Sequence, residues 1–483
     1  MRSRFLHRAV LGILLICWFP VCLATEISNP NESSKYLDAV REFADNVLKY
    51  GRDTYGPKHT PLFVDGLNIH THEPVKWIAP NGDRWILSNL ASQQNLFRTL
   101  DGLSTITGDS KYRQAAMETI AYAFENLRSP NRLLMWGGAQ AYDVSSDKPC
   151  GRYIHVFKNH YPYYQLMWEV NPEATRHLIE SLWSAHILNW ENLDMNRGVR
   201  YRSLSSPVEN PWDHEYRGRP GSFQGKGIAM VTTSSDLFYS GSMLFKLSGN
   251  KKPFIWSKRL ANRYAETRNL HTGISTYAYN IGKDYAVAYQ FGDDFNDCVA
   301  ANLPLFPGHG GTGSSVNRQC GLGLHMVTPG ISYNIVLGPR ICALLLGTML
   351  GEEGEYFKRW ALDEMTAWGN VAYRKSANCW VPMFTDGTSI EGYTLKKGGY
   401  FGPKGTVIES IPAIPMDFWG YALAYRVTGD EFMLEMARNI AQGLGLGDID
   451  YSLDGKSQLN TQTDSWQPYT LLGFLELYKK KPE

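Results

Sequence analysis

The spacing of apolar residues along the chain predicts helices over most of its length. Between residues 109 and 128, apolar side chains recur every three or four positions, which is the period of one helix face. Another predicted helix, Glu173–Trp190, carries two adjacent apolar stripes and must therefore pack on more than one side. The same pattern predicts helices over Ser235–Leu247, Phe254–Arg268, Gly338–Leu350, Tyr356–Tyr373, Phe418–Val427 and Glu431–Leu444. The chain is thus predicted to be all-α.

Three of these predicted helices follow a similar joint. Thr107-Gly108-Asp109, Ser248-Gly249-Asn250 and Thr428-Gly429-Asp430 each end one apolar segment and precede the next. Gly allows a left-handed turn after a helix, and Asp or Asn caps the helix that follows. Such joints are typical of αα-hairpins, and several hairpins closed in a ring form an (α/α) barrel or toroid. Because no strict period is present, an open solenoid is the alternative.

Three long Gly- and Pro-rich stretches interrupt the helices, at Val208–Gly227, Asn302–Gly330 and Asp386–Thr406. Loops of this length in a compact fold are usually functional or disordered. Their content of Trp, Tyr and Lys favours the functional alternative, in which these loops form the rim of a substrate-binding site. In the third stretch, Asp386 and Tyr393 are candidate substrate contacts.

The N-terminus has the pattern of a secretory signal peptide. Arg2, Arg4 and Arg8 precede an apolar run that ends near Leu23, and Ala24 supplies a small residue at the exit. The run is shorter than the ~20 residues that a spanning helix needs. We therefore expect residues 1–24 to be removed and residues 25–483 to form a single exported catalytic domain, periplasmic or secreted. No later segment is apolar enough to predict a membrane contact.

Charge and composition narrow the range of ligands. The formal net charge is +1, and loss of the three arginines with residues 1–24 makes it −2. A nearly neutral chain has no broad basic field for nucleic acid. Its 14 Trp and 28 Tyr residues suit an exported protein that holds sugars on ring faces, although packing in a large core explains many of them.

Two short runs concentrate reactive side chains. His155–Tyr161 (HVFKNHY) holds two histidines, a lysine and a tyrosine, and Asn196–Arg202 (NRGVRYR) holds three arginines. The arginines have a structural alternative, since cations complement the dipole at the C-terminal end of a helix. The chain contains no P-loop, no HExxH and no paired-cysteine zinc motif.

These runs belong to a longer resemblance, which extends in order from about Thr71 to the C-terminus. It is carried by LSNLASQQNLFRTLDGLSTIT, WGG, HVFKNHYPYYQLMWEVNP, WSAHILNWENLDMNR, FTDGTSIEGY and YRVTGDEFMLEMARNIAQGLGLGD. In these phrases the chain resembles the family 2 pectate lyases. The resemblance implies an (α/α)7 toroid that cleaves uronic-acid polymers by β-elimination with the help of a transition-metal ion.

β-Elimination requires a base that removes the proton at C5 and a counter-charge for the sugar carboxylate as the enolate forms. The resemblance assigns the base to Arg197. It also places His155 and Lys158 at family positions, as candidate catalytic residues. Arginine has a pKa far above neutral, so neighbouring cations such as Arg200 and Arg202 would have to favour its neutral form.

The sequence differs from the family at the positions of the metal ligands. The positions of the family's three metal ligands hold Ala139, Val156 and Gly198, and none of these side chains binds a metal. We therefore expect no cofactor, with a divalent ion as the alternative. Lys158, Arg200 or Arg202 would then face the sugar carboxylate.

The remaining candidates concern substrate binding. Trp136, Tyr163 and Tyr164 are candidate sugar platforms, with core packing as the alternative for each, and His160 is a further candidate contact. Together with Arg200, Arg202, Asp386 and Tyr393, these residues complete the predicted substrate site.

Three functions agree with the sequence. The first is a metal-independent lyase for pectate or a related uronan. The second is a glycoside hydrolase on uronate oligosaccharides, for which Asp65, Asp83, Asp213 and Asp386 are the candidate acids, although they form no evident pair. The third is a carbohydrate-binding relative that has lost catalysis.

Overall fold

The structure is a computed structural model that describes residues 30–79, 81–135, 140–151, 154–156, 161–200, 210–219, 221, 223–282, 332–383, 385–394, 403–449 and 458–480. The chain divides into two compact units. Unit 1 comprises Met1–Ala185 and Gly198–Pro211, and unit 2 comprises His186–Arg197 and Trp212–Glu483. The predicted signal peptide and the loop Asn302–Gly330 lie outside the described residues.

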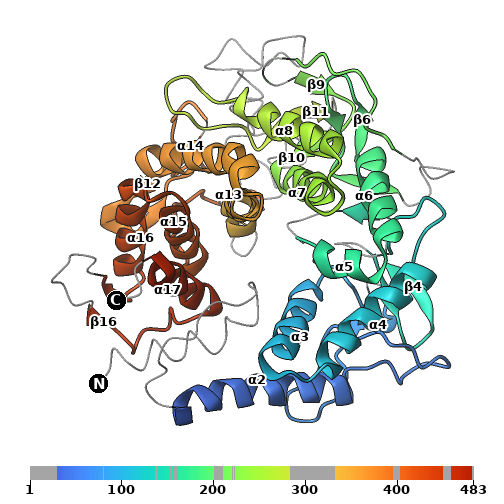
Figure 1. The fold of residues 1–483 in the computed structure, drawn as a ribbon. Helices are drawn as coiled ribbons and strands as arrows, with labels where there is room; N and C mark the ends of the chain where they lie inside the picture. Colours follow the sequence, from blue (N-terminus) through green and yellow to red (C-terminus); the bar gives the residue numbers. More distant parts are fainter. Residues whose placement is uncertain are drawn as a thin grey trace. The chain divides into compact units, whose positions relative to one another are not determined.

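Unit 1 is built on helices that pack in sequence order (Figure 1). The helices α3 and α4 form an αα-hairpin, and both contact α2, while α4 also contacts α5. A four-stranded antiparallel sheet with the order β1-β2-β3-β4 accompanies them. The elements of this unit are α2 (Pro30–Tyr50), β1 (Lys76–Ile78), β2 (Arg84–Ser88), α3 (Gln94–Thr107), α4 (Lys111–Asn126), β3 (Gln140–Asp143), β4 (Lys148–Gly151), β5 (Ile154–Val156), α5 (Tyr164–Val170), α6 (Pro172–His186, whose last residue belongs to unit 2) and β8 (Gly198–Arg200).

Unit 2 consists of helical pairs, α7 with α8, α13 with α14, and α15 with both α16 and α17. The helix α13 also contacts α7 and α15, so it joins these pairs into one core. The helices are α7 (Val231–Ser248), α8 (Lys251–Ala265), α13 (Ser332–Met349), α14 (Glu355–Val371), α15 (Pro415–Thr428), α16 (Glu431–Gly443) and α17 (Pro468–Lys480), with short 3-10 turns η1 (Gly351–Gly354) and η2 (Lys375–Ala377).

Short strands complete unit 2 and line the ends of its helices. The pair β6–β7 and the sheet β10-β11-β9 flank the start of α7, and β12-β13-β14 and β15–β16 lie near α14 and α16. Their bounds are β6 (Ile187–Asn189), β7 (Asp194–Met195), β9 (Phe223–Gly225), β10 (Ile228–Met230), β11 (Ala278–Gly282), β12 (Tyr373–Arg374), β13 (Cys379–Trp380), β14 (Ile411–Pro412), β15 (Gly447–Asp448) and β16 (Gln458–Leu459).

The three joints between helices have the predicted chemistry. Gly108, Gly249 and Gly429 have φ values of 74°, 76° and 75°, the left-handed conformation that glycine adopts without strain. The Asn250 side chain accepts a hydrogen bond from the N–H of Lys252, and Asp430 accepts from Phe432. Asp109 accepts from the N–H of Lys111 in the same way. The joints therefore produce the expected αα-hairpins, and the predicted all-α class of (α/α) hairpins is confirmed.

One predicted helix is too long. The segment predicted over Glu173–Trp190 is helical only to His186, after which Ile187–Asn189 forms the strand β6. Leu188 is 45% exposed, so the apolar stripe that suggested a continued helix does not continue as a buried face. Closure of the hairpins into a ring of seven, and their union into a single domain, stay predictions.

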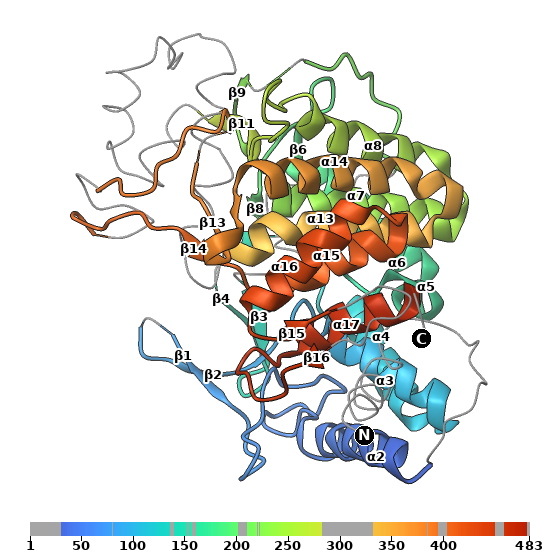
Figure 2. The ribbon, with the colours of Figure 1, turned by 90° about the vertical axis from the view of Figure 1, so that its left-hand side faces the viewer.

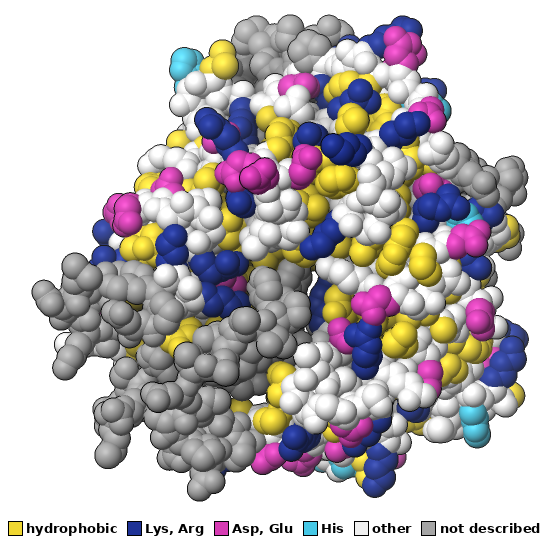
Figure 3. Space-filling model, in the orientation of Figure 1, with side chains coloured by type: hydrophobic (Ala, Val, Ile, Leu, Met, Phe, Trp, Pro, Cys, Tyr) yellow, Lys and Arg dark blue, Asp and Glu magenta, His cyan; other side chains and the backbone are white. Residues whose placement is uncertain are grey.

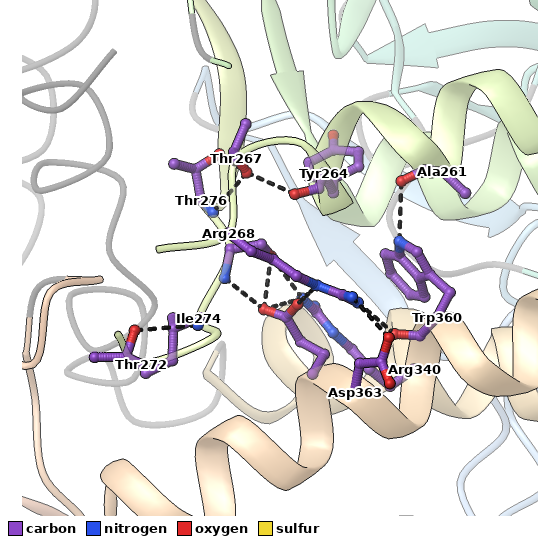
Figure 4. A network of polar contacts seen from close by, with 12 residues as sticks. Ala261, Tyr264, Thr267, Arg268, Thr272, Ile274, Thr276, Arg340, Trp360 and Asp363 are labelled. Carbon is purple, nitrogen blue, oxygen red and sulfur yellow. Dashed lines mark hydrogen bonds and ion pairs between the residues drawn. The ribbon is translucent and has the colours of Figure 1, made fainter. Parts of the chain in front are cut away.

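A buried ionic network ties the parts of unit 2 together (Figure 4). Glu364 on α14 and Arg340 on α13 are each 1% exposed and lie 3.4 Å apart. Glu364 also accepts from the Nε of Arg268 at 3.2 Å and from the N–H and hydroxyl of Ser275. Glu364 thus links Arg340 of α13 and the Ser275 segment to α14, while Arg268 also pairs with Asp363.

Among the described helices, none combines the length and the apolar character that crossing a bilayer requires.

Candidate functional site

Two segments far apart in the sequence meet in a short antiparallel ladder of unit 1. The strand β5 pairs with β8, so that His155 lies opposite Val199 and Val156 lies opposite Gly198. This register pairs the start of the histidine-containing run with Gly198–Arg200 of the arginine-containing run.

His155 is fully buried in this ladder, and Val199 opposite it is 7% exposed. A histidine without exposed surface is suited to orient neighbouring groups rather than to stack on a sugar. Full burial leaves no face of the His155 ring open to a ligand.

In unit 2, the main chain before Arg197 is fixed from both sides. The N–H of Asn196 donates to the carbonyl of His186 at 2.9 Å, and the N–H of Arg197 donates to the carbonyl of Ile228 at 2.9 Å. The Asn196 carbonyl accepts from Nδ1 of His186 at 2.7 Å. These bonds hold the backbone of the candidate base between the end of α6 and the strand β10.

His186 is neutral in this arrangement. Burial lowers the pKa of His186 to about 4, although the bond to the Asn196 carbonyl acts in the opposite direction. Because a carbonyl only accepts, Nδ1 must carry the proton that the bond uses. The neutral ring thus serves as a fixed donor to the backbone next to Arg197.

The half-buried side chain of Arg197 points along β10. One of its terminal nitrogens lies 3.5 Å from Sδ of Met230, which also accepts from the Tyr277 hydroxyl at 3.3 Å. A thioether is a weak acceptor and stabilises a guanidinium cation less than a carboxylate would.

A buried polar cluster lies behind the Arg197 turn. The carboxylate of Asp194 accepts from the N–H of Lys226 at 2.8 Å and from the side-chain amide of Asn280. The same amide donates to the Met195 carbonyl at 2.9 Å, and its oxygen accepts from the N–H of Ala229. Asp194 and Asn280 are 5% and 0% exposed. Together they connect β7, β10 and β11, which carry the Asn196–Arg197 turn.

The backbone approaches this cluster too closely for any side chain at Gly227. A Cβ atom there would lie 2.3 Å from the carbonyl oxygen of Met195, which real contacts do not allow. Glycine is therefore required where the loop crosses β7.

Tyr164 is not a sugar platform, contrary to the prediction. It begins α5 and is fully buried, so neither face of its ring is open to a ligand. Tyr163 is half-buried, but its hydroxyl donates to Asp101 at 2.5 Å and the Arg98 guanidinium lies 5.0 Å from its ring centre. Burial, with the bond to Asp101, raises the pKa of Tyr163. Both tyrosines thus have structural partners in unit 1.

Asp386 and Tyr393 lie on one loop of unit 2 and are half-buried. The Asp386 carboxylate accepts from the N–H of Thr388 at 3.0 Å, which closes a local turn. The backbone of Tyr393 bonds to Ile390 and Ile408, and this fixes the base of the loop. A role for the Asp386 and Tyr393 side chains as substrate contacts stays a prediction.

Several predicted residues lie outside the described part of the chain, namely Trp136, Ala139, Lys158, His160 and Arg202, together with the side chain of Arg200.

The candidate acids of the hydrolase alternative have local structural partners. Asp83 accepts from the Asn81 amide at 2.8 Å, and Asp65 accepts from the N–H of Asn89 at 2.8 Å. In unit 2, Asp213 pairs with Lys252 at 2.5 Å. Each of these three carboxylates therefore has a partner in a local turn or in a surface ion pair.

Two of the three positions that correspond to the family's metal ligands are direct register partners, Val156 and Gly198. Ligands at such positions would stand close together, as a metal site needs, but a valine and a glycine offer no donor atom. In the described residues, no group of three or more His, Cys, Asp or Glu side chains is placed to hold a metal ion.

Sequence reasoning missed the Asp194–Asn280 cluster, because the two residues are 86 positions apart and Asn280 belongs to none of the family phrases. On the face shown in Figure 3, basic and acidic side chains are interspersed over the surface.

Residues 60–483 match the family described as periplasmic pectate lyase. Over 395 residues the chain is 28% identical to a pectate disaccharide-lyase of Dickeya dadantii (strain 3937). The aligned region covers 78% of this chain and 69% of that protein.

Solved structures give weaker similarities. A D-mannose isomerase is 13% identical with a TM-score of 0.48, covering 93% of this chain and 99% of that one. A cellobiose 2-epimerase from Spirochaeta thermophila DSM 6192 is 12% identical with a TM-score of 0.44, covering 95% and 99%. These values carry no argument about chemistry. The family match covers most of the chain, and it leads to one conclusion: the chain belongs to the periplasmic pectate lyase family of polysaccharide-degrading enzymes.

Proposed function

We propose that this enzyme cleaves pectate or a closely related uronan by β-elimination, with Arg197 as the base that removes the C5 proton. The observation that carries the proposal is the family match over residues 60–483, and the resemblance that assigns the base to Arg197 supports it. The backbone bonds around Arg197 support it, because a base must be held in one geometry to reach its proton.

The proposed reaction proceeds without the family's transition-metal ion. Ala139, Val156 and Gly198 stand at the ligand positions, and none offers a donor. Lys158, Arg200 and Arg202 are the proposed source of positive charge for the sugar carboxylate, and they also disfavour a charged Arg197. His155, buried in the β5–β8 ladder, is proposed to orient these groups.

The substrate contacts are proposed to include Trp136, His160, Asp386 and Tyr393, which lie in the family phrases or on the loop that follows them. Export is proposed from residues 1–24, in agreement with the description of the family as periplasmic. Hydrolysis is less well supported, since the partners of Asp65, Asp83 and Asp213 suit structural roles.

The test is incubation of the protein with polygalacturonate, and with other uronans, with and without a chelator. We expect ultraviolet absorbance of unsaturated products to rise together with reducing ends, at the same rate in both conditions. Reducing ends without unsaturation would establish hydrolysis instead. A strong loss of activity with chelator would contradict the metal-independent reaction.

A further inference from the structure

One sulfur atom joins the candidate base to a buried tyrosine of unit 2. Sδ of Met230 lies 3.5 Å from a terminal nitrogen of Arg197 and accepts from the Tyr277 hydroxyl at 3.3 Å. Met230 and Tyr277 are 7% and 4% exposed, so the sulfur is shielded from water. A thioether has lone pairs and no proton to give, and it can therefore serve two donors at once.

The main chain fixes the position of this sulfur. Met230 ends the strand β10, pairs with Ala278 of β11 and directly precedes the helix α7. The N–H of Val231 donates to the carbonyl of Tyr277 at 2.9 Å, so the backbone also joins the segments that carry the sulfur and the hydroxyl. Figure 2 shows β9 and β11 at one end of the helices α7 and α8. The sulfur thus belongs to the junction between a strand pair and an 18-residue helix.

The hydroxyl groups next to the sulfur donate in a defined order. The Tyr277 hydroxyl has one hydrogen, which it donates to Sδ of Met230. Its oxygen lies 3.5 Å from the Thr232 hydroxyl, which must therefore be the donor in that contact. Thr232 is buried in the first turn of α7. A chain of hydrogen bonds therefore runs from α7 through Tyr277 to the sulfur, and the Arg197 guanidinium is the second donor to that sulfur.

We propose that Met230 is a positioning residue for Arg197, and that Tyr277 holds the Met230 sulfur in the orientation that receives the guanidinium. The inference rests on the proposed function, in which Arg197 removes the C5 proton. An arginine side chain has many rotatable bonds, whereas a base must meet its proton in one geometry. A sulfur acceptor favours one orientation of the side chain, and it stabilises the guanidinium charge less than a carboxylate would.

The first experiment measures initial rates of unsaturated-product formation from polygalacturonate as functions of substrate concentration and pH. In Met230→Leu the side chain keeps its size and apolar character but loses the acceptor, and such a replacement is usually tolerated in a core. In Met230→Gln an acceptor is restored. The control is Met243→Leu, because Met243 is a buried methionine of α7.

We expect Met230→Leu to lower kcat about tenfold, the upper range for one net hydrogen bond, while KM stays the same. Met230→Gln should recover most of this loss at high pH. Its rate should rise with pH at higher values than in the unaltered enzyme, because an amide oxygen favours the charged guanidinium more than a thioether does. A residue with a packing role alone would not produce this shift. Met243→Leu should match the unaltered enzyme in rate and in pH profile.

The second experiment does not depend on turnover. In protein with isotope-labelled methionine methyl groups, the nuclear magnetic resonance signal that is absent from Met230→Leu and Met230→Gln identifies Met230. Arg197→Ala and Tyr277→Phe should each move this signal, because each removes a donor to the sulfur. The signal of Met243, identified in the same way, should stay in place.

Rates of Met230→Leu equal to those of the unaltered enzyme would overturn the positioning role. So would a Met230 methyl signal that stays in place in both Arg197→Ala and Tyr277→Phe. If the unaltered enzyme releases no unsaturated product but Arg197→Ala moves the Met230 signal, the proposed reaction fails, while the orientation of Arg197 by Met230 stands.

Discussion

The side-chain amide of Asn280 donates a hydrogen bond to the carboxylate of Asp194, and both residues are buried. This bond connects β11 to β7 directly before Asn196 and Arg197. The geometry of the proposed base therefore depends on a contact between residues that do not touch the substrate in our account.

Replacing Asp194 with Asn should impair turnover more than substrate binding. The new side chain keeps one oxygen and turns its NH2 toward either the Lys226 N–H or the Asn280 amide, both of which now donate to the carboxylate. Loss of buried bonds to a charged group costs about 2–3 kcal/mol, so we expect lower stability in urea and a reduced kcat with little change in KM. Asp213→Asn, which alters an exposed ion pair, is the control. Normal turnover by Asp194→Asn would show that the cluster does not position Arg197.

The ionic network of Figure 4 predicts a contrast between two adjacent acids. Glu364 is buried between Arg268 and Arg340, whereas the neighbouring Asp363 pairs with Arg268 and is 44% exposed. Glu364→Gln should reduce the free energy of unfolding by about 3–5 kcal/mol, because it removes the carboxylate that faces the buried Arg340 guanidinium. Asp363→Asn should cost less than about 1 kcal/mol. Similar losses in chemical denaturation for both variants would refute this distinction.

Because the pKa of His186 is lowered, we expect the folded protein to lose stability in acid. Its pKa is lowered from 6.5 to about 4 by burial, so between these values the unfolded chain takes up a proton that the folded chain does not. Stability is then fully present above pH 6.5 and decreases as the pH falls toward 4, by about 3 kcal/mol in total. His186→Gln keeps a donor for the Asn196 carbonyl but cannot titrate. In His186→Gln, unfolding measured between pH 4 and 7 should no longer show the loss of stability that His186 causes. A pH dependence equal to that of the unaltered protein would contradict the role of His186.

For Asp417 we expect the opposite dependence of stability on pH, over nearly the same pH range. Burial raises the pKa of Asp417 from 3.8 to about 6, although it accepts from the N–H of Ile414 and from the Trp380 indole. The folded chain holds the extra proton, so this contribution is present below pH 3.8 and is lost as the pH rises through 6, by about 3 kcal/mol. Asp417→Asn should therefore make unfolding more sensitive to acid, because the effect of His186 is no longer offset. Asp430→Asn, which alters the cap of α16, serves as its control.

The helices were predictable from sequence because their signals are local. Apolar periodicity located α7, α8 and α13 to α16, and the glycine joints at Gly108, Gly249 and Gly429 marked the turns between hairpins. The end of α6 was missed because the pairing of Ile187–Asn189 with β7 is decided by residues that lie later in the chain.

The candidate site residues came from the family phrases and stay predictions. The phrases singled out Arg197 and His155, and within unit 1 the β5–β8 register pairs Ile154–Val156 with Gly198–Arg200. Tyr164 was assigned wrongly, since an aromatic residue at the start of a short helix gives no sign of which face is buried. The partners Glu364 and Arg340 lie on different helices, and their meeting depends on tertiary packing that no local pattern encodes.

The most direct test of the account is the initial rate of unsaturated-product formation from polygalacturonate by Arg197→Ala, compared with the unaltered enzyme. The Arg197 guanidinium is the proposed base, and loss of a general base lowers a rate by about 10²–10⁴-fold. We predict a decrease in that range, with unchanged thermal unfolding and retained binding to the polymer. Turnover near that of the unaltered enzyme, in a folded Arg197→Ala protein, would contradict the central claim.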